Sequence, residues 1–275
     1  MEARSLSRAE AKIILSLEAQ GRELITLDEI TGAAGASRGY GRKLAFGLVR
    51  KGWLERTRRG VYLLNPSRHG PDAIPDTDPF RVGSLLADPY YFGFATAAEV
   101  HGVFPQAGRV YYIVSPVRIG TRRFGTSRFR GVLLPRARFF GTETRERRGR
   151  TIVVSDLERT ILDVVNRPSL AGGMSGVGQI LSLSKPRIDW SRLAEYLERY
   201  GNRSLTRRLG YLADRVRPSL RPPGSWARAT RASPTEPFVP LGPPSRYGRR
   251  GPHDERWRII ANVADAELFA EGRIP

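Results

Sequence analysis

Cysteine is absent from the 275-residue sequence, and lysine and histidine are scarce. Without cysteine the chain can form neither disulfide bonds nor thiolate metal sites, which fits a reducing cytoplasm. The three histidines lie far apart in the sequence, so none has a neighbouring histidine at metal-ligand spacing. No apolar run approaches the ~18 residues that a membrane helix needs, and the N-terminal stretch has no signal-peptide core. The sequence therefore predicts a soluble, cytoplasmic protein with no membrane partner.

Positive charge is what the chain has in excess. Its net charge is +19, from 46 basic and 27 acidic residues, and only four of the basic residues are lysine. Arginine forms bidentate hydrogen bonds with phosphate and with guanine edges, so this composition favours a nucleic-acid partner. A GC-rich genome would produce the same arginine bias, and composition leaves both explanations open. The length and a hydrophobic fraction of 40% allow two domains with cores of their own.

Three short helical patterns occupy the N-terminal part of the chain. Residues 6–21 carry apolar side chains at helical spacing, which predicts a first helix. Thr26 and Glu29 have the spacing of a capping box and predict the start of a second helix, which ends at Gly35. Ser37 is placed to cap a third helix. The inward stripe of this third helix is predicted to contain Tyr40, Leu44, Ala45, Leu48 and Val49.

A hairpin pattern follows the third helix directly. Residues 53–56 and 60–64 are short strand-like runs around the basic turn 57–59. Three short helices, with a glycine turn before the last, form the layout of a helix-turn-helix, and a hairpin after the recognition helix forms its wing. The sequence therefore predicts a winged helix-turn-helix domain over residues 1–66, with DNA binding as its function.

Charge is distributed unevenly within this domain. Residues 1–35 have four basic and six acidic side chains, whereas residues 36–60 have eight basic side chains and one acidic side chain, Glu55. Cations gathered on the recognition helix and wing are what phosphate neutralisation requires. Winged helices can also bind proteins, and a solvated basic helix would then need no DNA. The predicted DNA-binding residues are Ser37, Arg38, Arg42, Lys43, Arg50, Lys51, Arg56, Arg58 and Arg59.

The remaining chain predicts a linker and a second domain. Residues 67–80 are rich in proline and lack periodicity, so they predict a linker. Residues 81–263 alternate amphipathic helices with four strand-like runs, and predict an α+β domain with a small antiparallel or mixed sheet. The strand-like runs are 110–114, 129–134, 137–144 and 151–154.

The C-terminal region differs in composition from the rest of the second domain. Residues 218–250 are rich in proline, glycine and arginine, and we expect them to be largely irregular. Residues 254–261 are apolar enough to dock as a final strand, and residues 264–275 are expected to form a tail.

A second basic stretch runs through the predicted strands. Residues 118–150 contain eleven arginines and two glutamates. Three interpretations stay open: a solvated face of the sheet, an extension of the DNA contact surface, or a surface for an acidic protein partner.

One group of three acidic residues could suggest an enzyme. Asp156, Glu158 and Asp163 lie near the end of a predicted strand, where carboxylates could hold Mg²⁺ for phosphodiester cleavage. Ser155 and Glu158 also have the spacing of a second capping box, Asp156 suits the first helical turn, and Asp163 fits a solvent-facing position. Arg159 could pair with one of them. The structural explanation is favoured, and no catalytic residue, metal or cofactor is predicted.

An ordered set of motifs resembles the AbiEi family of antitoxins, the regulator half of type IV toxin–antitoxin pairs. The set covers nearly the whole chain, from the winged helix to the last predicted strand. Its members are RRGVYLL (58–64), YYFGFATAAEVHG (90–102), VSDLERTILDVVNRP (154–168), the glycine pair 172–173, LTRRLGYL (205–212) and RWRIIANV (256–263).

The resemblance implies a function that the residues alone do not give. It implies an antitoxin that binds inverted repeats of double-stranded DNA in its own promoter and counteracts a cognate nucleotidyltransferase-like toxin, without cofactor or catalysis. No toxin-binding residue, operator sequence or oligomeric state can be named from the sequence. The alternatives are a winged-helix transcription factor whose second domain senses a small molecule, and a metal-dependent nuclease.

Overall fold

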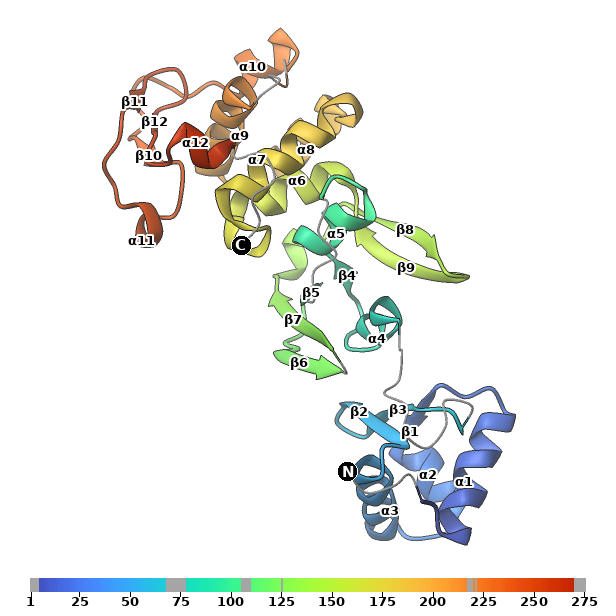
Figure 1. Ribbon diagram of the computed structural model, residues 1–275. Coiled ribbons are helices and arrows are strands. Elements are labelled where there is room, and N and C mark those ends of the chain that lie inside the picture. Colours follow the sequence, from blue (N-terminus) through green and yellow to red (C-terminus); the bar gives the residue numbers. More distant parts are fainter. Residues whose placement is uncertain are drawn as a thin grey trace. The chain divides into compact units, whose positions relative to one another are not determined.

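The computed structural model describes residues 5–67, 78–104, 110–124, 126–216, 220 and 222–269 (Figure 1). The chain divides into two compact units. The first comprises residues 1–88 together with 122–128, and the second comprises residues 89–121 and 129–275. The architecture is mixed helix and sheet, with a helix-turn-helix at the N-terminus, so the predicted α+β fold class is confirmed.

The three predicted N-terminal helices are present, and each begins at a side-chain cap. They are α1 (Arg8–Ala19), α2 (Leu27–Ala34) and α3 (Arg38–Arg50). The predicted capping box of α2 is confirmed, because the Glu29 amide donates to Thr26 Oγ1 (3.1 Å) and the Thr26 amide donates to Glu29 Oε2 (2.7 Å). Ser7 and Glu10 form a further capping box at α1. These caps satisfy amides at the helix starts that have no partner within the helix.

The predicted inward stripe of α3 is wrong at one position. Tyr40 is 49% exposed, and the stripe instead begins at Gly41 and continues through Leu44, Ala45 and Leu48. A Cβ on Gly41 would lie 2.3 Å from Thr31 Oγ1 on α2, so the glycine lets the two helices pack closely. Close packing of this kind places the small residue inside and turns the neighbouring tyrosine to solvent.

The wing is a three-stranded sheet with the order β1-β3-β2. The predicted hairpin strands are β2 (Leu54–Arg58) and β3 (Val61–Leu64), and β1 (Leu24–Thr26) pairs antiparallel with β3. Strand β2 runs two residues further than predicted, and its register shifts between Arg56 and Arg58. The turn therefore narrows to Arg59 and Gly60, and the glycine adopts a positive φ of 74° that suits a tight turn. The three-residue strand β1 is too short to show a period-two pattern in the sequence.

Most of the predicted linker lies outside the described residues, namely residues 68–77. Helix α4 (Pro79–Ser84) follows, with proline in its first turn and Asp78 as its cap (Oδ1 to the Phe80 amide, 3.1 Å). The sequence predicts a short helix over residues 81–87, and the structure places it two residues earlier at its start, at Pro79.

A six-stranded sheet has the order β6-β7-β5-β4-β9-β8. It is mixed, since β4 pairs parallel with β9 and antiparallel with β5. Two of its strands were not predicted, β4 and β6, and the run at 137–144 is displaced because residues 136–138 form a 3-10 turn. The strands are β4 (Tyr91–Phe92), β5 (Val110–Ser115), β6 (Thr121–Phe124), β7 (Ser127–Leu133), β8 (Thr142–Arg147) and β9 (Arg150–Ser155).

Helices build the main core of the second unit. Helix α6 is its centre, with every residue from Leu157 to Val165 buried. This includes the inward stripe that helical spacing predicts, namely Leu157, Ile161, Val164 and Val165. The 3-10 turns Arg136–Arg138, Pro168–Leu170 and Lys185–Arg187 connect elements of this unit. The helices are α5 (Phe94–Val100), α6 (Leu157–Asn166), α7 (Gly173–Ser184), α8 (Trp190–Tyr200) and α9 (Arg203–Arg215).

The C-terminal region is more ordered than its composition predicts. Helix α10 (Gly224–Thr230) interrupts the stretch 218–250, and its Trp226 ring packs edge-on against Trp190 at 5.0 Å. The predicted final strand docks as β12, parallel to β10 and antiparallel to β11. The side chain of Trp257 is fully buried beside it. The remaining elements are β10 (Val239–Pro240), α11 (Pro244–Tyr247), β11 (His253–Asp254), β12 (Ile259–Ile260) and α12 (Asp265–Leu268).

Candidate nucleic-acid interface

Helix α3 presents a cationic outer face. Its inward stripe buries residues 41, 44, 45 and 48, so the residues between them face solvent. Ser37 caps the helix, because its Oγ accepts a hydrogen bond from the Tyr40 amide at 3.4 Å, and Ser37 itself is exposed. The exposed residues beyond it include Arg38, Arg42, Lys43, Phe46 and Arg50.

The cations of α3 differ in whether they have an ion-pair partner within the fold. Arg38 lies 3.2 Å from Asp28 Oδ1, but the two side chains are 62% and 71% exposed, so water and salt weaken this pair. Among the described residues, Arg42 and Lys43 have no hydrogen-bond or ion-pair partner. These two side chains are therefore available to an external anion.

Lys51 is used inside the fold. Its Nζ lies 2.7 Å from Oε2 of Glu10, whose side chain is 7% exposed. Burial raises the pKa of Glu10, but hydrogen bonds from Lys51 and Ser7 outweigh it and lower the pKa below its ordinary value. Lys51 thus compensates a buried carboxylate at the start of α1. This role was not foreseen in the sequence, which placed Lys51 with the DNA-binding cations.

The wing contributes a smaller group of cations. Arg56 and Arg59 are exposed, and the side chain of Arg58 lies outside the described part of the chain. Thr57 Oγ1 donates to the Val61 carbonyl at 3.1 Å and helps to hold the turn. Burial raises the pKa of Glu55 to about 7. The one acid of residues 36–60 is therefore only partly ionised at neutral pH and offsets little of the positive charge.

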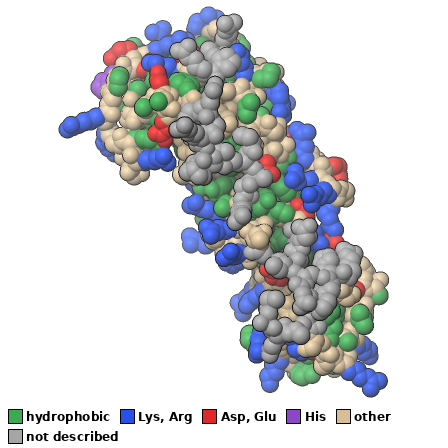
Figure 2. Space-filling model, in the orientation of Figure 1, with side chains coloured by type: hydrophobic (Ala, Val, Ile, Leu, Met, Phe, Trp, Pro, Cys, Tyr) green, Lys and Arg blue, Asp and Glu red, His purple; other side chains and the backbone are tan. Residues whose placement is uncertain are grey.

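Two aromatic side chains accompany these cations. Phe46 is 66% exposed and Tyr40 is 49% exposed. Phe46 is not among the residues predicted from the sequence, although it lies one helical turn after Arg42 and off the buried stripe. Lys and Arg side chains are prominent on the visible face of each unit, with hydrophobic side chains among them (Figure 2).

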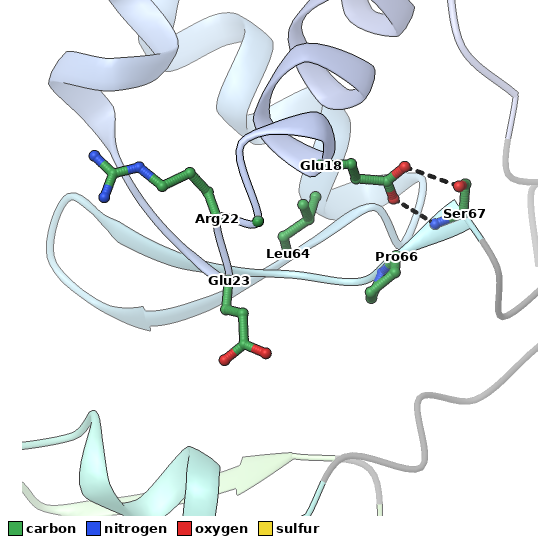
Figure 3. Close-up of a pocket in the computed structure, with 7 residues that line it drawn as sticks. Glu18, Arg22, Glu23, Leu64, Pro66 and Ser67 are labelled. Atoms are coloured by element: carbon green, nitrogen blue, oxygen red, sulfur yellow. Dashed lines mark hydrogen bonds between the residues drawn. The ribbon is translucent and has the colours of Figure 1, made fainter. Parts of the chain in front are cut away.

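A shallow hollow of about 230 Å³ lies elsewhere in the first unit, between the end of α1 and the end of β3. Figure 3 shows Glu18 on one side of it, bonded to both the amide and the hydroxyl of Ser67. Arg22 forms an ion pair with Glu29. Glu23, which also lines the hollow, pairs with Arg81. The charged side chains that line the hollow thus already have partners within the fold, and Glu18 holds the chain where it leaves the wing.

The three acids near the strand end have structural partners. The predicted cap of α6 is wrong by one residue, because β9 runs through Ser155 and Asp156 is the cap, accepting the Arg159 amide at 2.8 Å. Asp156 also accepts the Tyr196 hydroxyl (2.7 Å), and Glu158 accepts the Asp189 amide (2.9 Å). Within the described residues, no group of three or more His, Cys, Asp or Glu is placed to hold a metal ion.

Asp163 is buried, which corrects the prediction that it faces solvent. Its Oδ1 lies 3.1 Å from Nε of Arg159, whose side chain is fully buried, so the predicted pairing of Arg159 with one of the acids is confirmed. The Tyr91 hydroxyl donates to the same carboxylate at 3.2 Å. Burial raises the pKa of Asp163, opposed by the adjacent guanidinium. The Asp163 carboxylate thus links α6 to Tyr91 of strand β4 in the sheet.

The basic stretch 118–150 is largely exposed. Arginines of the β6–β7 and β8–β9 hairpins reach solvent, among them Arg123, Arg130 and Arg148. Arg145 pairs with Glu143 at 2.7 Å, and Arg138 stacks over the Tyr200 ring at 4.5 Å. The described residues of this stretch therefore include solvated cations, which leaves the three interpretations open.

Comparison with known proteins gave matches to both units. A family model described as "Transcriptional regulator, AbiEi antitoxin" matches residues 12–65, and one described as "AbiEi antitoxin C-terminal domain" matches residues 91–215. A search of curated protein sequences gave no match. The crystal structure of the RV2827C protein from Mycobacterium tuberculosis is similar in fold, with a TM-score of 0.70 and 16% identity over 98% of this chain and 97% of that one. No helix of the described residues is both long and apolar enough to cross a membrane.

Proposed function

Because the chain belongs to the AbiEi antitoxin family, a family of regulators, we propose that it is the antitoxin and transcriptional autorepressor of a type IV toxin–antitoxin operon. Its first unit binds double-stranded DNA at inverted repeats in its own promoter. Its second unit, within residues 81–263, counteracts a cognate nucleotidyltransferase-like toxin. Both activities take place in the cytoplasm.

The observation that carries this proposal is the placement of free cations on α3. Arg42 and Lys43 lie on the outer face of the helix that follows the glycine turn, and no described acid pairs with them. A helix of this width fits the major groove, where basic side chains reach phosphates and base edges. Simple solvation of the helix would be served by charges of either sign, whereas residues 36–60 have eight basic side chains and one acidic side chain.

Ser37 and the wing extend the same contact surface. The N-terminus of α3 carries partial positive charge and free amides, so the backbone near Ser37 suits a phosphate oxygen. Arg56 and Arg59 on β2 and its turn reach the flanking backbone or the minor groove. Repression follows sterically, because a protein seated on promoter repeats blocks the polymerase.

Lys43→Ala and Lys12→Ala form a matched test of DNA binding. Both lysines are exposed and helical, and Lys12 lies on α1 away from the proposed surface. We expect Lys43→Ala to weaken binding to the promoter fragment at low salt and to flatten the slope of log K against log salt by about 0.9. Lys12→Ala should change neither quantity. Equal losses for the two variants would overturn the assignment of α3 as the DNA-contacting element.

A separation of functions tests the proposed antitoxin role. The variant with Arg42→Ala and Lys43→Ala should lose repression of a promoter reporter and still rescue cells that express the neighbouring toxin gene. Loss of rescue together with repression, in a variant that is still folded, would contradict the division of labour between the two units.

A further inference from the structure

Phe46 is the most exposed of the large hydrophobic side chains in the described residues, with 66% of its surface in solvent. It lies on the outer face of α3, opposite the buried stripe. Arg42 and Arg50 lie one turn before and after it, and Lys43 lies three residues before it, all of them exposed. A phenyl ring thus occupies the centre of a cationic helix face.

The fold gives this ring no packing role. Phe46 belongs neither to the core of the first unit nor to the partly buried residues that pack against that core. The residues one helical turn away on the outer face, Arg42, Lys43 and Arg50, are themselves exposed and leave 66% of Phe46 in solvent. A phenyl ring held in water loses the free energy that burial would give it, so the ring gains by contact with an apolar surface.

We propose that Phe46 is a specificity-determining residue that packs against the C5-methyl group of a thymine in the major groove. The inference rests on the proposed function, in which α3 enters that groove. Phenylalanine cannot read the hydrogen-bond donors and acceptors of base edges, and thymine methyl is the apolar group that base edges present in the major groove.

Other sites for the ring fit the structure less well. A helix about 10 Å wide does not enter the minor groove, which is about 6 Å wide, so insertion of the ring from that side is disfavoured. A protein partner is disfavoured because the exposed Lys43 lies beside the ring, and lysine is depleted in protein interfaces. Duplex DNA satisfies both the ring and its charged neighbours.

Uracil substitution tests the contact directly, because it removes the methyl group and preserves base pairing. The probe is the promoter fragment, made in three forms. One contains thymine throughout, one contains uracil in place of every thymine, and a set contains uracil in place of a single thymine. Loss of one methyl contact is expected to weaken wild-type binding about fourfold. Phe46→Ala should bind the thymine fragment more weakly and should not distinguish thymine from uracil. Leu15→Ala, at a 54% exposed residue of α1, should behave as the wild type.

The outcomes separate this inference from the proposed function. Equal wild-type affinity for the thymine and uracil fragments would overturn the inference and leave promoter binding intact. The same holds if Phe46→Ala keeps the wild-type sensitivity to uracil, or if it keeps full DNA affinity and instead loses toxin rescue. Absence of salt-dependent promoter binding by the wild type would remove the proposed function and this inference with it. Unchanged thermal unfolding of Phe46→Ala shows that the variant is folded.

Discussion

Replacement of Lys51 by methionine should separate a structural cation of the first unit from the cations proposed to bind DNA. Methionine keeps most of the aliphatic length of lysine but removes the ammonium group that lies 2.7 Å from Glu10 Oε2. Glu10 would keep the hydrogen bond from the Ser7 amide, also 2.7 Å long, and would lose the compensating charge. The carboxylate would then be held against α3 with a single charge-assisted partner.

The expected cost is about 2 kcal/mol of the unfolding free energy at pH 7, the usual loss for a hydrogen bond to a charged group. It stays below the ~3–5 kcal/mol for a fully buried pair, because Lys51 is still 26% exposed. The fold lowers the pKa of Glu10 below 4.5, the value in the unfolded chain. Ionised Glu10 therefore stabilises the fold fully at pH values above 4.5. That stabilisation is lost as pH falls through the lower folded pKa. The difference between wild type and Lys51→Met should therefore shrink in acid.

Hydrogen exchange of α1 and α3 amides measures this locally, without unfolding of the second unit. The matched variant is Lys43→Met, which removes an exposed lysine of the same region. We expect Lys51→Met to lower the protection of these amides and to keep promoter affinity. Lys43→Met should keep their protection and weaken promoter affinity. Full protection in Lys51→Met, combined with lost salt-dependent DNA affinity, would refute the structural role of Lys51.

Three further predictions concern packing and buried charge. Gly41→Ala should destabilise the first unit by ~1–3 kcal/mol in thermal unfolding, because the added Cβ would meet a threonine oxygen at 2.3 Å. Gly39→Ala, whose Cβ would make only an ordinary contact at 3.8 Å, should stabilise the unit by up to ~1 kcal/mol. Asp163→Asn leaves the guanidinium of Arg159 buried without its carboxylate, and should cost ~3–5 kcal/mol in urea unfolding followed by tryptophan fluorescence; a loss below ~1 kcal/mol would contradict the pairing. Glu55→Gln should raise stability above pH 7 by ~1–2 kcal/mol, a value reduced for solvent screening of this partly exposed group, and should change nothing below pH 4.5. The reason is that burial raises the pKa of the wild-type carboxyl to about 7, so the wild type loses stability as pH rises from 4.5 to 7. A gain that is equal at both ends of this range would exclude Glu55 as its source.

Local chemistry explains which elements the sequence predicts well. The capping box of Thr26 and Glu29 joins residues three apart, and the stripe of α6 repeats at helical spacing, so both can be identified without any tertiary knowledge. The wing was predicted from two short strand-like runs around a basic turn. In contrast, β6 (Thr121–Phe124) has exposed residues at its first three positions and therefore gives no alternating pattern.

The errors arise where tertiary contacts decide. Tyr40 was placed inside because it is apolar, but close helix packing selects the glycine beside it. Asp163 was placed in solvent because it is charged, but the partner that allows its burial is Arg159 on the same helix, together with Tyr91 from the sheet. The ion pair of Lys51 with Glu10 was also missed, because its partner lies 41 residues away in the sequence, while the assignment of Lys51 to the DNA-binding cations stays a prediction.

The last part of the chain completes the interior of the second unit. Trp257 is fully buried, its Nε1 donates to Asp214 Oδ2 at 2.7 Å, and a Cβ on Gly210 would lie 2.3 Å from its ring. Helix α9 is thus shaped to receive a side chain that the ribosome adds more than forty residues later. A nascent or clipped chain that ends before this tryptophan would leave a ring-sized void beside α9. Folding of this unit is therefore coupled to synthesis of the chain at least as far as Trp257, well beyond the end of α9.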